Sequence, residues 1–148
     1  MTTTTTQTVQ VYQLFIKATP EAIWEAITKP EFTERYFYKA RIEISSAGHR
    51  SRGPDGSVWA DEPVHEFDPP RRLVHGWRSL YDPDLAGEEP SRVTWEIEPQ
   101  DGGYCLLTVT HDQLDGAPKT AESVGGVGWM MVLSGLKTLL ETGEALVP

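Results

Sequence analysis

Two histidines are the residues of this sequence best placed to do chemistry. His75 lies in the segment Leu73-Val74-His75-Gly76-Trp77, and His111 closes the segment Leu107-Thr108-Val109-Thr110-His111. Both segments have the alternating apolar pattern of a β-strand with one buried face. An imidazole on such a face can donate or accept a proton near neutral pH, so it can hold a polar group of a ligand or transfer a proton.

Several interpretations of these two histidines stay open. Each ring can be a core histidine bonded to a backbone carbonyl, because a buried polar group without a partner costs about 1–3 kcal/mol. Each can be the polar contact in an otherwise apolar pocket. Glu66 is the best candidate carboxylate for a general acid and base. A metal site would need a third ligand at suitable spacing, and Cys105 adds little. No metal and no cofactor is therefore predicted.

Large aromatic and aliphatic side chains share the inferred inner surface with the histidines. Trp77 has the parity of His75, and Trp95 lies on the apolar side of a cleanly alternating strand. Rings of this size either fill a core or line a pocket. No residue is predicted to be catalytic. The predicted ligand-binding residues are Tyr36, His75, Trp77, Trp95, His111, Trp129 and Leu133.

The elements that must position these residues begin with a strand and two short helices. Val9 to Ala18 alternates as a strand does, and Thr19-Pro20-Glu21 combines an N-cap, a first-turn proline and an acid. Pro30-Glu31 opens a second short helix. Short strands with turn residues between them are then predicted around Ile42–Ile44, Val58–Ala60, Val64–Phe67, Leu73–Trp77, Arg92–Glu98 and Tyr104–Thr110.

A long helix closes the chain. Its apolar stripe is Trp129, Val132, Leu133, Leu136, Leu139 and Leu140, and Gly143 is a suitable C-terminal cap. Glycine disfavours a helix interior by about 1 kcal/mol relative to alanine. Gly125, Gly126 and Gly128 therefore favour a helix that starts near Val127, with a flexible gate at the glycines as the alternative.

Strands in the middle and helices at the ends indicate an α+β fold. The long helix can bury its stripe only against the strands, so a curved antiparallel sheet wrapped around the C-terminal helix is predicted. Residues 1–8 are predicted to be a flexible tail and residues 9–148 a single domain.

A set of residues in these elements carries a resemblance. They are Ala18-Thr19-Pro20-Glu21, Ile23-Trp24, Ile27-Thr28, Pro30-Glu31, Val64, Glu66, Asp68-Pro69-Pro70-Arg71-Arg72-Leu73, Trp77, Val93-Thr94-Trp95, Leu107-Thr108-Val109-Thr110-His111, Gly128-Trp129, Leu133, Leu136-Lys137 and Leu140-Glu141-Thr142-Gly143. Over about Val9 to Gly143 the chain resembles the START-like (SRPBCC) superfamily, within it the homologues of the activator of heat-shock protein 90 ATPase (AHSA1-like, C-terminal-domain-like). The resemblance implies a helix-grip, Bet v 1-like fold. Relatives bind lipids, hormones, polyketide intermediates or aromatic compounds, some are cyclases or dehydratases, and the family's name implies a link to the stress response.

Composition restricts the classes of molecule that this protein is expected to bind. Thirteen Lys plus Arg against 22 Asp plus Glu give a formal net charge of -9, which disfavours nucleic acid and anionic membranes. Cys105 is the single cysteine, so no internal disulfide forms. The N-terminus lacks a signal-peptide pattern, and no run approaches the roughly 18 apolar residues of a membrane span. A cytoplasmic location without membrane insertion is expected.

The function predicted from these observations is the binding of a small hydrophobic or aromatic molecule between the sheet and the C-terminal helix. Two alternatives stay open: a cyclase, dehydratase or hydrolase that uses His75 or His111, and a protein-interaction module related to chaperone ATPase activators. A homodimer is also left open.

Overall fold

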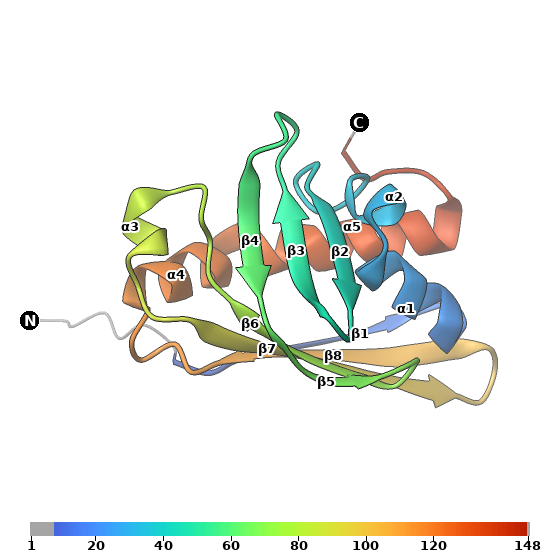
Figure 1. Ribbon diagram of the computed structural model, residues 1–148. Helices are drawn as coiled ribbons and strands as arrows, with labels where there is room; N and C mark the ends of the chain where they lie inside the picture. Colours follow the sequence, from blue (N-terminus) through green and yellow to red (C-terminus); the bar gives the residue numbers. More distant parts are fainter. Residues whose placement is uncertain (1–7, 148) are drawn as a thin grey trace, which may run out of the picture.

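The computed structural model describes residues 8–147, so the tail predicted for residues 1–8 lies, apart from Thr8, outside the described residues. The predicted strands and helices appear in the predicted order, and the structure adds a strand at Gly48–Arg52 and a short helix at Pro83–Ala86 that were not predicted (Figure 1). The elements are β1 (Gln10–Ile16), α1 (Pro20–Thr28), α2 (Pro30–Thr33), β2 (Arg41–Ser45), β3 (Gly48–Arg52), β4 (Val58–Glu62), β5 (Val64–Asp68), β6 (Arg72–Trp77), α3 (Pro83–Ala86), β7 (Ser91–Gln100), β8 (Tyr104–Asp112), α4 (Pro118–Ser123), the π-helical turn η1 (Val124–Gly128) and α5 (Trp129–Thr142).

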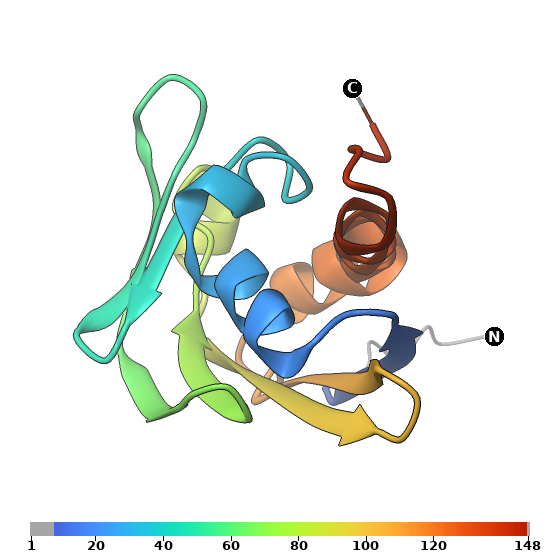
Figure 2. The same cartoon turned by 90° about the vertical axis from the view of Figure 1, so that its right-hand side faces the viewer.

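The strands form two antiparallel sheets that curve around α5. One sheet has five strands in the order β1-β8-β7-β6-β5, and the other has three in the order β2-β3-β4. In Figure 1, α5 lies above the five-stranded sheet and behind the three-stranded sheet. Figure 2 looks almost along α5, with the larger sheet beneath it, the smaller sheet at the left, and α1 and α2 between. This arrangement confirms the predicted helix-grip α+β fold.

Local sequence accounts for where the helices begin and end. The Thr19 hydroxyl accepts a hydrogen bond from the Ala22 backbone N–H at 3.1 Å, which caps α1 as predicted. At the other end of the chain, Gly143 adopts φ 79° and its N–H bonds to the Leu139 carbonyl at 2.8 Å. This left-handed turn ends α5 because glycine adopts it without strain.

The core lies between α5 and the larger sheet. The predicted inner faces are confirmed, since Leu73, Val93, Leu107 and Val109 are all fully buried. From the helix side, α5 buries Trp129, Val132, Leu133, Gly135, Leu136 and Leu139. The apolar faces of the strands therefore pack against the apolar face of the helix, as the two periodicities predict.

The start of the long helix differs from the prediction. Helical structure begins at Pro118 and runs without a break through η1 into α5, so the glycines do not lie in a preceding loop. The Trp129 N–H bonds to the Val124 carbonyl, which is the i to i+5 pattern of a π-turn. The glycines are accommodated by one wider turn.

The continuous helical run Pro118–Thr142 is 25 residues long and is apolar enough to cross a membrane by length and composition alone. Its stripe is, however, the buried face described above. The helix serves as the core helix of an α+β domain.

Strand β1 lies at an edge of the larger sheet, and side chains of α5 cover part of that edge. Lys137 Nζ donates to the Phe15 carbonyl at 2.6 Å, and the Lys17 N–H donates to Glu141 Oε2 at 2.8 Å. Lys137 and Glu141 also pair with each other at 2.8 Å. The end of β1 is thereby tied to the helix.

Candidate functional site

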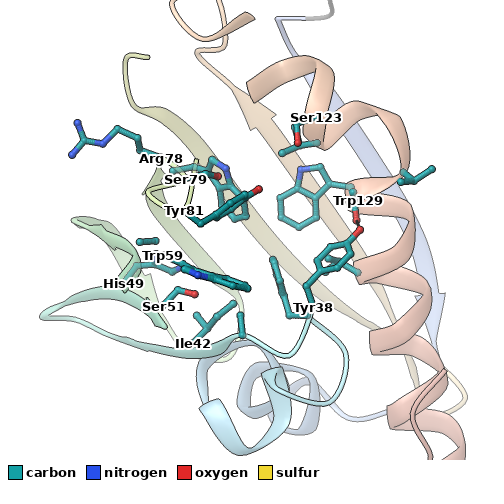
Figure 3. Close-up of a pocket in the computed structure, with 18 residues that line it drawn as sticks. Tyr38, Ile42, His49, Ser51, Trp59, Arg78, Ser79, Tyr81, Ser123 and Trp129 are labelled. Atoms are coloured by element: carbon teal, nitrogen blue, oxygen red, sulfur yellow. Dashed lines mark hydrogen bonds between the residues drawn. The ribbon is translucent and has the colours of Figure 1, made fainter. Parts of the chain in front are cut away.

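A cavity of about 410 Å³ lies between the three-stranded sheet and the start of the long helix (Figure 3). Its walls come from β2, β3 and β4, from the end of β6 and the following loop, from the loop before β2, and from the helical run between α4 and α5. Its lining residues are Phe37, Tyr38, Ala40, Ile42, His49, Ser51, Trp59, Ala60, Trp77, Arg78, Ser79, Tyr81, Ser123, Val124, Val127, Gly128, Trp129 and Val132.

Aromatic rings make up much of this wall. The ring centroids of Trp77 and Trp129 lie 5.6 Å apart, and those of Trp59 and Tyr81 lie 5.3 Å apart. A Cβ atom on Gly53 would meet the Trp59 ring at 2.3 Å, so the missing side chain of Gly53 makes room for this indole. A cavity with such walls suits a flat, apolar molecule.

One side of the cavity is bounded by exposed residues of the helical run and of two loops. Val127 of η1, Tyr38 and Tyr81 are each more than half exposed. The Tyr38 hydroxyl donates to the Gly128 carbonyl at 3.5 Å, which joins the loop before β2 to the π-turn. Tyr38 and Lys39 both have left-handed backbones, with φ of 52° and 60°, a conformation that costs energy for residues other than glycine.

His111 forms one of two buried tryptophan–histidine pairs. Trp129 Nε1 donates to His111 Nδ1 at 3.0 Å, and His111 Nε2 lies 2.8 Å from the Ser91 hydroxyl. An indole N–H can only donate, so Nδ1 of His111 must be unprotonated and Nε2 must carry the proton. Both ring nitrogens of His111 are therefore occupied in the neutral form.

His75 forms the second pair. Trp95 Nε1 donates to His75 Nε2 at 3.0 Å, and His75 Nδ1 lies 2.7 Å from the Gly76 carbonyl. The same argument places the proton on Nδ1, where it is donated to the carbonyl oxygen. Here too a neutral ring has no nitrogen left for a ligand.

Burial keeps both rings neutral. It lowers the pKa of His75 from 6.5 to about 4 and, together with the nearness of His75, lowers the pKa of His111 from 6.5 to about 3. Neither ring can serve as a proton shuttle without first losing a tryptophan partner. Their geometry matches a structural role, in which each fixes the orientation of an indole.

The predicted site residues divide into those on the cavity wall and those outside it. Trp77 and Trp129 line the cavity. His75, His111, Trp95 and Leu133 are buried next to it without forming its lining. Their predicted contact with a ligand stays a prediction.

Two further predicted residues lie elsewhere. The Tyr36 hydroxyl donates to the Ala26 carbonyl at 2.7 Å, and Tyr36 borders a separate hollow of about 490 Å³ beside the C-terminal segment. Glu66 pairs with Arg72 at 3.1 Å, with nearly half of each side chain exposed. This carboxylate is therefore engaged near the surface and is not available to His75.

His49 is the histidine that sequence reasoning missed. It lines the cavity, is 3% exposed, and stacks on His75 with ring centroids 4.3 Å apart and planes 4° apart. Within residues 8–147 it has no hydrogen-bond partner, and its Nδ1 is enclosed. Burial and the neighbouring His75 lower the pKa of His49 well below 6.5. Of the three histidines in this cluster, His49 is the one with a ring nitrogen left to offer.

In the described part of the chain, no three His, Cys, Asp or Glu side chains gather closely enough to hold a metal ion.

Comparison with known proteins identifies the family. The sequence profile described as "Activator of Hsp90 ATPase homolog 1-like protein" matches residues 17–141. The chain belongs to this family. No curated protein matches the sequence.

Solved structures of this family share the fold. Protein MLL2253 from Mesorhizobium loti is 25% identical, with a TM-score of 0.71 over 90% of this chain and 96% of that one. An HSP90 activator from Plasmodium falciparum is 18% identical, with a TM-score of 0.73 over 91% and 97% of the two chains. The Aha1 dimer from Colwellia psychrerythraea is 18% identical, with a TM-score of 0.71 over 94% and 100%. These TM-scores show a common architecture.

Proposed function

We propose that this domain binds a small, largely apolar molecule with a flat ring system in the cavity between the three-stranded sheet and the start of α5. The observation that carries the proposal is a space of about 410 Å³ walled by Trp59, Trp77, Trp129 and Tyr81. Ligand pockets commonly measure about 300–1,000 Å³ and are lined mainly by apolar and aromatic groups.

The pair of Trp129 and His111 supports this proposal. His111 fixes the Trp129 indole through its N–H, and Trp129 in turn packs against Trp77. The Trp129 ring of the wall is therefore held in place by a buried hydrogen bond before a ligand arrives. Such preorganisation reduces the ordering cost of binding.

Narrowing the cavity should weaken binding without unfolding the domain. Ala60 on β4 lines the cavity and is 9% exposed, so Ala60→Leu places three more carbons in that space. Naphthalene should raise the melting temperature of the wild-type domain because a ligand that binds only the folded state stabilises it. We expect a smaller rise for Ala60→Leu. Differential scanning calorimetry with and without naphthalene measures both effects.

Val58→Leu is the matched control, since Val58 lies on the same strand, is exposed and does not line the cavity. It should respond to naphthalene as the wild type does. An equal response of Ala60→Leu and the wild type, or no response of the wild type to naphthalene and to larger apolar ring systems, contradicts the proposal.

A second candidate is activation of a chaperone ATPase. It is favoured by the match to the Plasmodium falciparum HSP90 activator, of which this chain covers 97%, and by the name of the family. Purified domain added to Hsp90 should then increase the rate of ATP hydrolysis. An unchanged rate at saturating domain concentration removes this candidate.

A further inference from the structure

One wall of the cavity carries polar side chains that have no partner. His49 and Ser51 are alternate residues of β3, so they lie on the same face of that strand. They are 3% and 5% exposed, and both line the cavity (Figure 3). Ser79, which follows β6, lines the cavity as well and is 6% exposed. Within residues 8–147 none of the three side chains forms a hydrogen bond.

Buried polar groups without partners are rare in native proteins because each has lost its hydration and gained nothing in return. The two other histidines of this cluster show the usual outcome, since His75 and His111 use both ring nitrogens. His49 belongs to the same buried cluster and uses neither. The exception falls on the ring that lines the cavity, where a bound molecule can supply the partner.

The available groups define which ligand atoms fit. Nδ1 of His49 is enclosed, so Nε2 is the nitrogen that can reach a bound molecule. A serine hydroxyl can both donate and accept. A hydroxyl or carbonyl oxygen of the ligand would therefore satisfy His49 and Ser51, whereas a purely hydrocarbon edge would leave both without partners.

The charge of the wall restricts the ligand further. Among the described lining residues Arg78 is the one side chain with a fixed charge, and Figure 3 shows it pointing away from the aromatic rings. His49 is neutral because burial lowers its pKa. A carboxylate or ammonium group bound to His49 and Ser51 would find no charged lining side chain except Arg78, which points the other way, and burying a charge there is unfavourable.

We infer that the molecule taken by this cavity is an uncharged ring compound with a hydroxyl or carbonyl oxygen on the edge that faces β3, where His49 and Ser51 bind that oxygen. The inference rests on the proposed function and adds the polarity and orientation of the ligand. It makes His49 the residue that determines specificity.

Naphthalene, 2-naphthol and 2-naphthoate test the inference because they share one ring system and differ in the group at one position. Isothermal titration calorimetry at pH 7 gives the affinity of each. The wild type should bind 2-naphthol more tightly than naphthalene, and 2-naphthoate at least about tenfold more weakly than 2-naphthol.

Two variants test whether His49 and Ser51 cause the preference for 2-naphthol over naphthalene. His49→Phe keeps a flat ring next to His75 and removes the nitrogens, and Ser51→Ala removes the hydroxyl alone. In each, the ratio of the 2-naphthol affinity to the naphthalene affinity should fall about fivefold or more, because the ligand hydroxyl then lacks a partner. His65→Phe is the matched control, since His65 is exposed on β5, and its ratio should equal that of the wild type. Melting temperatures establish that each variant is folded. If His49→Phe does not fold, Ser51→Ala decides the test.

The outcomes separate the two claims. An unchanged ratio in both variants, or tighter binding of 2-naphthoate than of 2-naphthol, overturns the inference while naphthalene binding leaves the proposed function standing. Failure of all three compounds to bind the wild type removes the proposed function, and the inference falls with it.

Discussion

Acidification from pH 7 to pH 4 should strongly lower the free energy of unfolding of this domain. His75 and His111 are buried and neutral, with pKa values lowered from 6.5 to about 4 and about 3. In the unfolded chain both rings regain ordinary pKa values, so the unfolded state binds more protons below pH 6.5. Stability is therefore fully present above that pH and is lost as the pH falls towards the folded-state values.

The expected size of this loss is large. Two protons taken up on unfolding correspond to a slope of about 2.7 kcal/mol per pH unit. Between pH 6.5 and pH 4 the free energy of unfolding should then fall by roughly 6 kcal/mol, against a total of about 5–15 kcal/mol for a typical domain. His49 acts in the same direction, while Glu62 opposes it because burial raises the pKa of its carboxyl.

Urea unfolding at pH 7, 6, 5 and 4 measures this slope. His75→Phe should be less stable at pH 7, since Trp95 loses its acceptor. Its free energy of unfolding should depend less steeply on pH, because about one proton fewer is taken up on unfolding. Val58→Leu, at an exposed position without a titratable group, should keep the wild-type slope. A free energy of unfolding that stays constant between pH 6.5 and pH 4.5 would refute the assignment of both rings as neutral and buried.

Trp129→Ala should be the most damaging single substitution in the chain. The indole is 2% exposed and contacts the rings of Tyr12, Phe37, Trp77, Trp95 and His111. Removing a buried tryptophan costs about 3–5 kcal/mol. Leaving His111 Nδ1 without its donor adds about 1–3 kcal/mol. The free energy of unfolding measured by chemical denaturation should fall by about the sum of these two costs.

Trp129→Phe separates these contributions because it keeps an aromatic ring and lacks the N–H. We expect it to lose mainly the hydrogen bond to His111, with a cost of about 1–3 kcal/mol. Met130→Ala changes the next residue of α5, which is 54% exposed, and should stay within about 0.5 kcal/mol of the wild type. Equal stability of Trp129→Ala and Met130→Ala would contradict the packing described here.

Periodicity predicted most of the strands, the long helix and their inner faces. In β7, Val93, Trp95 and Ile97 alternate with polar residues, and all three are buried. The same logic placed His75 and His111 inside. It could not reveal that each would meet a tryptophan from a different element, because those contacts depend on strand register and on side-chain rotamers. The pairing of His111 with Val93, for example, sets its position relative to Ser91 and Trp129.

The candidate site was harder to predict because its polar wall lies on an atypical strand. β3 reads Gly48-His49-Arg50-Ser51-Arg52, which has no apolar residue to mark a buried face. His49 and Ser51 are nevertheless buried, since the strand is held between β2 and β4 with its inner face against the cavity. A strand whose inward residues are polar looks like a loop in sequence, and the residues most informative about a ligand were missed for that reason.

The tie between β1 and α5 has a consequence for how this protein behaves at high concentration. Val9, Val11 and Phe15 of this edge region are exposed and apolar, and an open strand edge of that composition is a template on which other chains can add and fibrils can grow. Lys137 and Glu141 occupy backbone groups at Phe15 and Lys17 that an incoming strand would need. This surface ion pair thus blocks strand addition at the end of β1.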